Sequence, residues 1–322
     1  GEGRGPRLQR AAMRCLACGE ETAGRAWRGV GDYEYGAYRP VSYISCSRCR
    51  VIVQSPLPPA ELIPSFYPPD YRNRLIVKSG LFYFLKRAQT RWLARRLGRY
   101  IGGTGKKVLE LGYGSGELLL ALHWLGFRNL AGADFDDAGA AHLEDRGIRF
   151  RRANMEEGFP FSEQFDCVIM VNVIEHFLDP VGVLSRIRER LAPGGIVILI
   201  TPNAAALELL LFGRFWSGFH APRHIWLFSR DGFVRLGRSL GFALTTVRPA
   251  ADPGQWAISI QNMFQATRVC RSRLSSGLAW YTVYLSVLAA PLAWLQNLWL
   301  GRSTTIFAVL RRDETKNGDG GL

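Results

Sequence analysis

Two pairs of cysteines near the N-terminus carry the most specific chemical signal in the sequence. Each pair has the spacing C-x-x-C, and 27 residues separate the pair Cys15 and Cys18 from the pair Cys46 and Cys49. Each pair can present two thiolates from one tight turn, and two such turns complete a tetrahedral zinc site with Zn–S bonds of about 2.3 Å. Four cysteine ligands leave no open coordination position, so we expect a structural zinc. Redox pairs and unligated cysteines are the alternatives.

A glycine-rich loop is the second chemical signal. The segment KVLELGYGSGELLL, residues 107–120, reads as a short apolar strand, a turn with three alternating glycines and the start of a helix. Such a junction brings backbone amides and the positive end of a helix close to a ligand. A dinucleotide-binding G-x-G-x-x-G motif needs a third glycine at position 117, where this chain has Glu117. Glu110, at the mouth of the loop, suits a ligand that carries an ammonium or sulfonium charge.

This acidic residue followed by three glycines resembles the first motif of the class I S-adenosylmethionine-dependent methyltransferases. The order of cysteine pairs, P-x-P-P-x-x-L, F-Y and Y looks like the bacterial members that carry an N-terminal zinc ribbon, among them ubiquinone-pathway and secondary-metabolite enzymes. The resemblance implies an α/β fold with a Rossmann-like seven-stranded sheet and S-adenosyl-L-methionine as cofactor. The loop residues that it places at the cofactor are Glu110, Leu111, Gly112, Tyr113, Gly114 and Gly116.

Three strand ends beyond the loop complete the expected cofactor site. Strand and helix patterns alternate, which favours a parallel sheet covered on both faces. The second strand ends at Asp134, 22 residues after Gly112, where a strand-end carboxylate can bind both ribose hydroxyls. In the resembling family an acidic residue at the position of Asn154 contacts the adenine, and the asparagine oxygen can still accept that hydrogen bond. The fourth strand, FDCVIMVNV, resembles the family's fourth motif, which puts Asn172 beneath the sulfonium. Phe135 and Met155 adjoin this site.

Histidines beyond the fourth strand are the candidate catalytic groups. Methyl transfer from a sulfonium is an in-line displacement that depends mainly on positioning, and a hydroxyl acceptor also gains from losing its proton to a nearby base. His176 is the first candidate for that base, with Glu175 beside it. His220 and His224 lie in FWSGFHAPRHIWLFS, a segment that folds over the acceptor pocket in the relatives that it resembles. Structural hydrogen bonding is the alternative role for all four residues.

The sequence divides into four regions. We expect a disordered N-terminus at 1–12, the zinc ribbon at 13–55, a Pro- and Tyr-rich connector at 56–80 and the methyltransferase domain at 81–322. The formal net charge of +14 suggests an anionic neighbour, or it reflects an arginine-rich composition. The N-terminus has no signal-peptide pattern, so we expect the cytosol, with peripheral or monotopic attachment to a membrane as an addition.

An apolar insertion separates the last two predicted strands, 243–249 and 304–312. Residues 274–301 carry no charge, which by length alone makes them a transmembrane candidate. Both flanking strands belong to one sheet, so a single crossing would leave the last strand on the wrong side. An even number of crossings, a re-entrant hairpin broken near Pro291 or a monotopic apolar platform remain, as do a homodimer interface and a lid. We predict that the insertion, 255–301, contacts a membrane surface beside the active-site mouth.

Three functions compete. The first is methyl transfer, with O-methylation favoured, to a small-molecule or lipid-linked acceptor at a membrane surface. The second is methylation of rRNA or another nucleic acid, which the scattered charges and the apolar insertion disfavour. The third is a non-catalytic cofactor-binding scaffold.

Overall fold

A computed structural model describes most of the chain. The described residues are 13–36, 38–68, 71, 81–137, 139–269, 277–299 and 302–313. The predicted disordered segment 1–12 and parts of the predicted connector and insertion, residues 72–80, 270–276 and 300–301, lie outside them.

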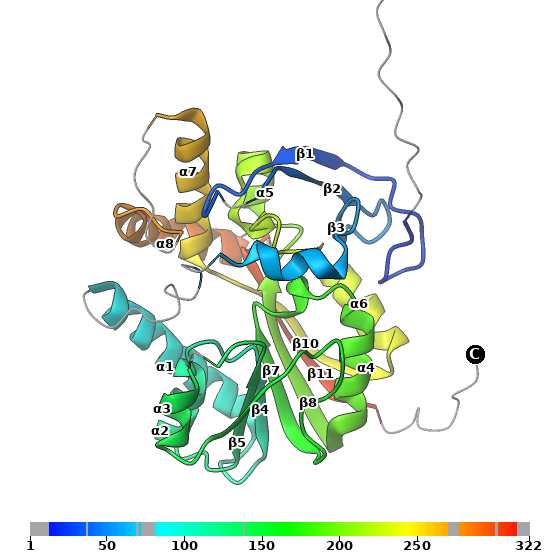
Figure 1. The fold of residues 1–322 in the computed structure, drawn as a ribbon, viewed down its shortest axis with the longest axis vertical. Coiled ribbons are helices and arrows are strands. Elements are labelled where there is room, and N and C mark those ends of the chain that lie inside the picture. The colour runs from blue at the N-terminus through cyan, green and yellow to red at the C-terminus, as the bar shows by residue number, and fades with distance from the viewer. Residues whose placement is uncertain are drawn as a thin grey trace, which may run out of the picture.

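A seven-stranded sheet forms the centre of the molecule, in the order β10-β11-β8-β7-β4-β5-β6 (Figure 1). Strands β4 to β8 pair in parallel, and β11 runs antiparallel between β8 and β10. The predicted α/β, Rossmann-like fold with seven strands is therefore confirmed. The strands span Val108–Leu111 (β4), Leu130–Asp134 (β5), Arg149–Arg152 (β6), Phe165–Val171 (β7), Leu191–Pro202 (β8), Phe242–Ala250 (β10) and Thr305–Arg312 (β11).

Helices cover both faces of this sheet because its strands bury side chains on both sides. In β7, Cys167 and Ile169 pack with α1, α2 and α3, whereas Val168 and Met170 pack with α4 and α6. Alternation along a strand sends successive side chains to opposite faces. The two helical layers lie on either side of the sheet in Figure 1. Their helices span Leu81–Ile101 (α1), Glu117–Trp124 (α2), Ala140–Glu144 (α3), Pro180–Arg190 (α4) and Arg230–Ser239 (α6).

The four paired cysteines belong to a second, four-stranded sheet in the order β1-β2-β3-β9. Only three of its strands come from the predicted ribbon. Strand β9, which lies in the segment FWSGFHAPRHIWLFS, pairs antiparallel with β3 through Leu227 and Trp226. We call β1, β2, β3, the loops between them and the two cysteine turns the cysteine module. The strands span Ala26–Val30 (β1), Val41–Ser45 (β2), Ile52–Gln54 (β3) and Trp226–Leu227 (β9).

The described residues of the insertion between β10 and β11 form two helices, α7 (Pro253–Thr267) and α8 (Thr282–Trp299). The Asp252 side chain accepts a hydrogen bond from the Gly254 amide and so caps α7. Pro291 lies inside α8, so the alternative of a hairpin broken near this residue is wrong. Helix α7 ends at Thr267, and the C-cap residue Arg268 has a φ of 60°. No helix among the described residues combines the length and the apolar character that a membrane crossing requires.

Shorter elements connect these layers across the top of the sheet (Figure 1). They are η1 (Ala60–Phe66), η3 (Ile174–His176), α5 (Leu207–Phe212), η4 (Gly213–Phe215) and η5 (Ser217–Phe219). The carboxyl ends of the parallel strands face these elements. The predicted site residues at these strand ends therefore lie between the sheet and the cysteine module.

Candidate active site

The glycine loop between β4 and α2 has the backbone that its sequence predicts. Gly112, Gly114 and Gly116 have φ values of 70°, 53° and 75°, a region that favours glycine. At Gly112 a Cβ atom would also lie 2.4 Å from Cγ2 of Val173. Gly116 is the N-cap of α2, so the loop directs the start of that helix toward the strand ends.

Asp134, at the end of β5, lies against this loop. Its Oδ2 accepts a hydrogen bond from the Gly114 amide at 2.9 Å, and its Oδ1 accepts one from the Asp136 amide at 3.2 Å. Burial raises the pKa of Asp134, and the backbone amides oppose that rise. The structure thus brings the predicted ribose carboxylate to the glycine loop, at hydrogen-bond distance.

Glu110 lies beneath the loop in a nearly closed environment. It is 4% exposed, and its Oε2 has no hydrogen-bond partner among the described residues. Burial first, and then the charge of Asp134, raise the pKa of Glu110 well above its usual range. A positive charge close to Glu110, such as that of a sulfonium group, would favour its ionised form. Leu111 and Tyr113 are buried beside it, whereas the Phe135 side chain is 54% exposed.

The remaining predicted cofactor residues lie at the ends of two other strands. After β6, the Asn154 Oδ1 accepts from the Glu156 amide and its Nδ2 donates to Glu157, so its side chain stabilises a turn. Met155 is buried in the core. After β7, Asn172 has a φ of 53°, and its amide donates to the Ile200 carbonyl at 2.7 Å. These strand ends lie on the same edge of the sheet as the glycine loop.

Three histidines from two distant segments form one cluster. The ring of His176 is 4.6 Å from that of His224 and 6.5 Å from that of His220, centroid to centroid, and the other pair is separated by 5.1 Å. Tyr67 joins the cluster to Phe135, one of the predicted cofactor residues. Its hydroxyl is 3.0 Å from Nδ1 of His176, and its ring packs 5.4 Å from that of Phe135.

Hydrogen bonds to carbonyl groups fix two of these imidazoles. Nδ1 of His176 lies 3.1 Å from the Arg223 carbonyl, and Nδ1 of His224 lies 2.7 Å from the Gly218 carbonyl. Because a carbonyl only accepts, Nδ1 of His224 carries the proton and its Nε2 is the basic nitrogen. Nδ1 of His176 contacts both a carbonyl and the Tyr67 hydroxyl. Burial lowers the pKa of His176 to about 3 and lowers the pKa of His224 well below its usual value. Both rings are therefore neutral at pH 7.

Glu175 is fully buried next to this cluster. Its Oε2 accepts a hydrogen bond from Thr201 Oγ1 at 2.9 Å, and its Oε1 lies 3.8 Å from Nε2 of His224 without a hydrogen-bond partner among the described residues. Burial raises the pKa of Glu175 to about 8. One ligand atom each from Glu175, His176 and His224 lie within 4.8 Å of one another, so this group could hold a divalent cation.

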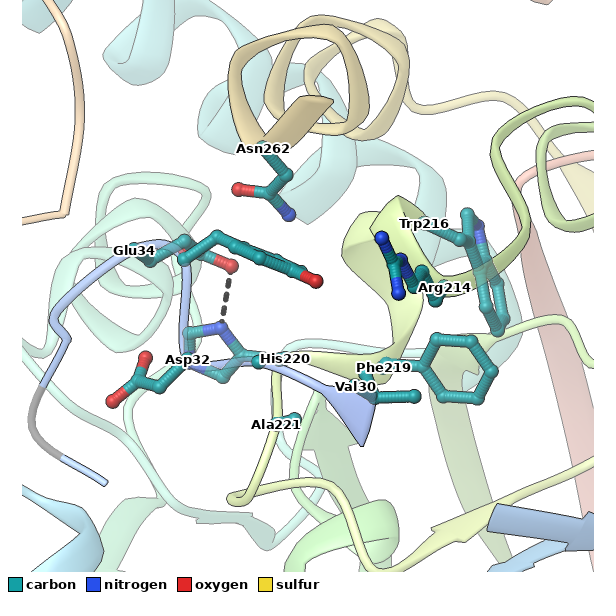
Figure 2. Close-up of a pocket in the computed structure, with 11 residues that line it drawn as sticks. Val30, Asp32, Glu34, Arg214, Trp216, Phe219, His220, Ala221 and Asn262 are labelled. Carbon is teal, nitrogen blue, oxygen red and sulfur yellow. Dashed lines mark hydrogen bonds and ion pairs between the residues drawn. The ribbon is translucent and has the colours of Figure 1, made fainter. Parts of the chain in front are cut away.

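The cysteine module contributes two acidic residues that the sequence did not identify. Asp32 makes a bidentate ion pair with Arg223, at 3.1 Å and 3.0 Å, and Glu34 lies 2.8 Å from Nδ1 of His220. Figure 2 shows Glu34 and His220 facing each other beside a small pocket, with Asn262 of α7 above them. The relevant sequence separations are 191 and 186 residues, and no local pattern marks such pairs.

The four cysteine sulfurs converge as expected. The Sγ atoms of Cys15 and Cys49 are 3.4 Å apart, those of Cys18 and Cys46 are 3.5 Å apart, and all four lie within 4.8 Å. Sulfurs in a tetrahedral zinc site are separated by about 3.8 Å, as Zn–S bonds of about 2.3 Å require. The donor set therefore fits a structural zinc ion.

Comparison with known proteins agrees with this geometry. A methyltransferase domain family model matches residues 81–247. A "Ubiquinone biosynthesis O-methyltransferase" from Cereibacter sphaeroides is 30% identical over 132 residues, which cover 38% of this chain and 53% of that protein. One from Ruegeria pomeroyi is 27% identical and covers 54% and 77%. The chain spans about half the length of the first curated relatives that it matches.

Solved structures of methyltransferases are also similar. The 1,6-didemethyltoxoflavin-N1-methyltransferase of Burkholderia thailandensis aligns with 85% of this chain and 96% of its own, at 14% identity and a TM-score of 0.49. The family model covers more than half of the chain, and the strand order and glycine loop described above are those expected for the same family. The chain therefore belongs to the methyltransferase domain family and has the fold of the class I S-adenosylmethionine-dependent methyltransferases.

Proposed function

We propose that this protein transfers a methyl group from S-adenosyl-L-methionine to a hydroxyl group of a small-molecule acceptor. The observation that carries the proposal is the histidine cluster at the glycine-loop edge of the sheet, joined to that edge through Tyr67 and Phe135. A neutral imidazole can take the hydroxyl proton as the oxygen attacks. The names of the "Ubiquinone biosynthesis O-methyltransferase" relatives support oxygen as the methylated atom.

The cofactor supplies the electrophilic methyl group, and the protein supplies position. In this proposal Asp134 binds the ribose hydroxyls, while Asn154 and Asn172 lie at the adenine and methionine ends. Glu110 faces the positive charge from below the loop. Displacement at a methyl carbon requires little covalent help, so holding donor and acceptor in line is the main contribution.

Calorimetry with S-adenosyl-L-methionine tests cofactor binding, with Gly114→Arg as the control that fills the loop. Incubation of an extract with methyl-labelled cofactor then identifies the acceptor, and NMR of the product identifies the methylated atom. Binding by the wild type with labelled O-methyl product is the expected result. Binding without any product would favour the scaffold alternative, and a salt-sensitive shift of labelled rRNA would favour the nucleic-acid alternative.

We further propose that zinc occupies the four-cysteine site in a structural role. Four thiolates supply a closed donor set, and metal ligation by cysteine contributes directly to folding. Elemental analysis of purified protein should give one zinc per chain. Cys46→Ser should lower both this content and the melting temperature, and a full zinc content in that variant would contradict the proposal.

We also propose that the acceptor is linked to a lipid and reaches the site at a membrane surface. Helix α8 exposes an apolar face, on which Leu288 is 72% and Leu292 is 53% exposed. The insertion leaves the sheet from the carboxyl end of β10, the edge that carries the glycine loop. A helix with aromatic and aliphatic side chains on one face can lie in a membrane interface. The exposed apolar residues of α8 and the turn before it are Trp280, Tyr284, Val287, Leu288, Leu292, Trp294, Leu295 and Leu298.

Vesicle flotation tests this attachment. The full chain should float with vesicles of phosphatidylcholine and phosphatidylglycerol, and Leu288→Glu with Leu292→Glu should stay in the soluble fraction. Trp124→Glu is the matched control, because Trp124 is a 73% exposed apolar residue on α2. Equal recovery of the wild type and the α8 variant in the soluble fraction would contradict membrane contact. Dimers of the wild type that the α8 variant abolishes would assign this face to a second copy of the chain.

A further inference from the structure

The contact between Glu34 and His220 connects the cysteine module with the proposed reaction. Glu34 lies in the loop between β1 and β2, and His220 follows η5 in the segment over the sheet. Their side chains are 4% and 8% exposed, and Oε1 of Glu34 lies 2.8 Å from Nδ1 of His220. We propose that His220 is the proton acceptor of the methyl transfer and that Glu34 is the positioning residue that orients it. The inference rests on the proposed function.

Within the described part of the chain, His220 is the one clustered histidine with a carboxylate at hydrogen-bond distance. Nδ1 of His224 contacts a backbone carbonyl, and Nδ1 of His176 contacts a backbone carbonyl and the Tyr67 hydroxyl. These partners fix the rings but carry no full charge. A base that accepts a proton becomes an imidazolium, and an adjacent carboxylate stabilises that product. All three residues are histidines with little solvent exposure, so residue type and burial do not indicate which one is the base. The partner of Nδ1 does.

A buried ion pair holds the Glu34 loop in place. Asp32 pairs with Arg223, and both side chains are almost completely buried. Oδ1 of Asp32 also accepts a hydrogen bond from the Tyr35 amide at 3.2 Å, and the Asp32 carbonyl accepts one from the Gly36 amide at 2.9 Å. The loop is therefore fixed on both sides of Glu34, relative to the segment that carries His220. This arrangement supplies the fixed orientation that a positioning residue needs.

The charged and titratable groups around His220 come from several elements. Glu34 and Tyr35 belong to the cysteine module, and the Tyr35 and Tyr71 rings lie 6.1 Å and 6.2 Å from the His220 ring. His176 and His224 complete the cluster, and the Arg223 guanidinium lies 4.4 Å from the centre of the Tyr35 ring. Among these groups, Glu34 is the one whose carboxylate supports a positive charge on His220.

The proposed step moves one proton and transfers one methyl group. With Nδ1–H donated to Glu34, Nε2 of His220 takes the proton of the acceptor hydroxyl while the oxygen forms a bond to the methyl carbon. The carbon–sulfur bond breaks, and its electron pair stays on sulfur, which becomes the thioether of S-adenosylhomocysteine. Glu34 remains ionised throughout. His220 later releases the proton to water.

NMR of histidine imidazoles tests the contact without any acceptor. The chain has five histidines, so ¹⁵N-histidine labelling gives few signals, and His220→Asn assigns the one of interest. In the wild type we expect His220 with the proton on Nδ1. Glu34→Gln should move the titration midpoint of His220 to lower pH by about 1 or more. Glu20→Gln is the control, because Glu20 pairs with Arg48 at the surface of the same module. An unchanged midpoint and tautomer in Glu34→Gln would overturn the proposal.

Kinetics test the consequence, with dodecyl 3,4-dihydroxybenzoate as the acceptor probe. Glu34→Gln should lower kcat by about 10- to 100-fold and shift its pH profile, while zinc content, melting temperature and cofactor affinity stay near wild type. His220→Asn should be at least as slow, and the double variant should lose no more than His220→Asn. If the loss of kcat in the double variant equalled the product of the two single losses, Glu34 and His220 would act independently, which would contradict the proposal. If the wild type binds cofactor but methylates neither the probe nor an extract component, the proposed function fails, and the NMR titration still decides the Glu34 contact.

Discussion

The buried pair of Asp32 and Arg223 gives the sharpest test of how the cysteine module is joined to the rest of the protein. Nη1 of Arg223 donates to Oδ1 of Asp32, and Nη2 donates to Oδ2. The Asp32 side chain is 1% exposed and the Arg223 side chain is 0% exposed. Replacing either residue alone, as Asp32→Asn or Arg223→Met, leaves a buried charge without its partner. Such a change costs about 3–5 kcal/mol of folding free energy.

This cost converts to a measurable change in melting temperature. The entropy of unfolding is about 2.1 cal/mol/K per residue, or about 0.7 kcal/mol/K for the 322 residues of the chain. Dividing the cost in free energy by this entropy gives the shift in melting temperature. Each single variant should therefore melt about 4–7 °C below the wild type. Arg223 also lies over the rings of Tyr35 and Tyr71, at 4.4 Å and 5.7 Å. Loss of these cation–π contacts should make Arg223→Met the less stable of the two single variants, by about 1–2 kcal/mol.

The double variant separates a paired interaction from two independent losses. Asp32→Asn with Arg223→Met removes both charges, so it should melt no lower than Arg223→Met alone. Differential scanning calorimetry of the full chain, with zinc content checked in each sample, gives the three values. Single variants within about 1 °C of the wild type, a shift far below the one worked out above, would refute the reasoning. A double variant whose loss equals the sum of the single losses would refute it too.

Three further predictions concern Asp134, Gly116 of the glycine loop and Glu208 of helix α5. Asp134→Ala should weaken binding of S-adenosyl-L-methionine by about 10- to 100-fold in calorimetry, because charge-assisted hydrogen bonds contribute about 1.5–3 kcal/mol. Gly116→Ala should lower the free energy of unfolding by about 2–4 kcal/mol in urea titration, because φ is 75° and the new Cβ would lie 2.8 Å from Leu143 Cδ2. Burial raises the pKa of Glu208 to about 7, so its contribution to stability is full at low pH and is lost between about pH 4.5 and 7. As pH rises through that range, the free energy of unfolding of Glu208→Gln should increase relative to that of the wild type by at most about 1.4 kcal/mol per pH unit. Melting experiments from about pH 4 to 8 measure this difference.

Control variants distinguish these specific effects from general destabilisation of the fold. Gly105→Ala is the control for the loop, because no heavy atom lies within 4 Å of its added Cβ and its φ is not in the left-handed region. An equal loss in both glycine variants would count against the steric argument. Unchanged cofactor affinity in Asp134→Ala would remove the ribose role, and a constant difference between Glu208→Gln and the wild type across pH would remove the titration argument.

The sequence alone specified the parts of the site that depend on local backbone and on spacing. Gly112 and Gly116 could be recognised because a strand, a turn with positive φ and a helix follow one another within a few residues. Asp134 could be located because the second strand of a parallel sheet ends at the same edge as the first. The cysteine pairs carry their ligand geometry in their spacing. Each of these signals is local, so neighbouring residues contain it.

Tertiary structure decided which distant side chains meet. Glu34 and Asp32 lie 186 and 191 residues from their partners, and strand β9 joins the cysteine module through non-local pairing, so no sequence pattern announces these contacts. The sequence favoured His176 as the base because it follows a strand end. The structure shows that its Nδ1 faces a carbonyl and the Tyr67 hydroxyl, whereas the Nδ1 of His220 faces a carboxylate. The chemistry of an imidazole depends on its partner, and only the folded chain supplies that partner.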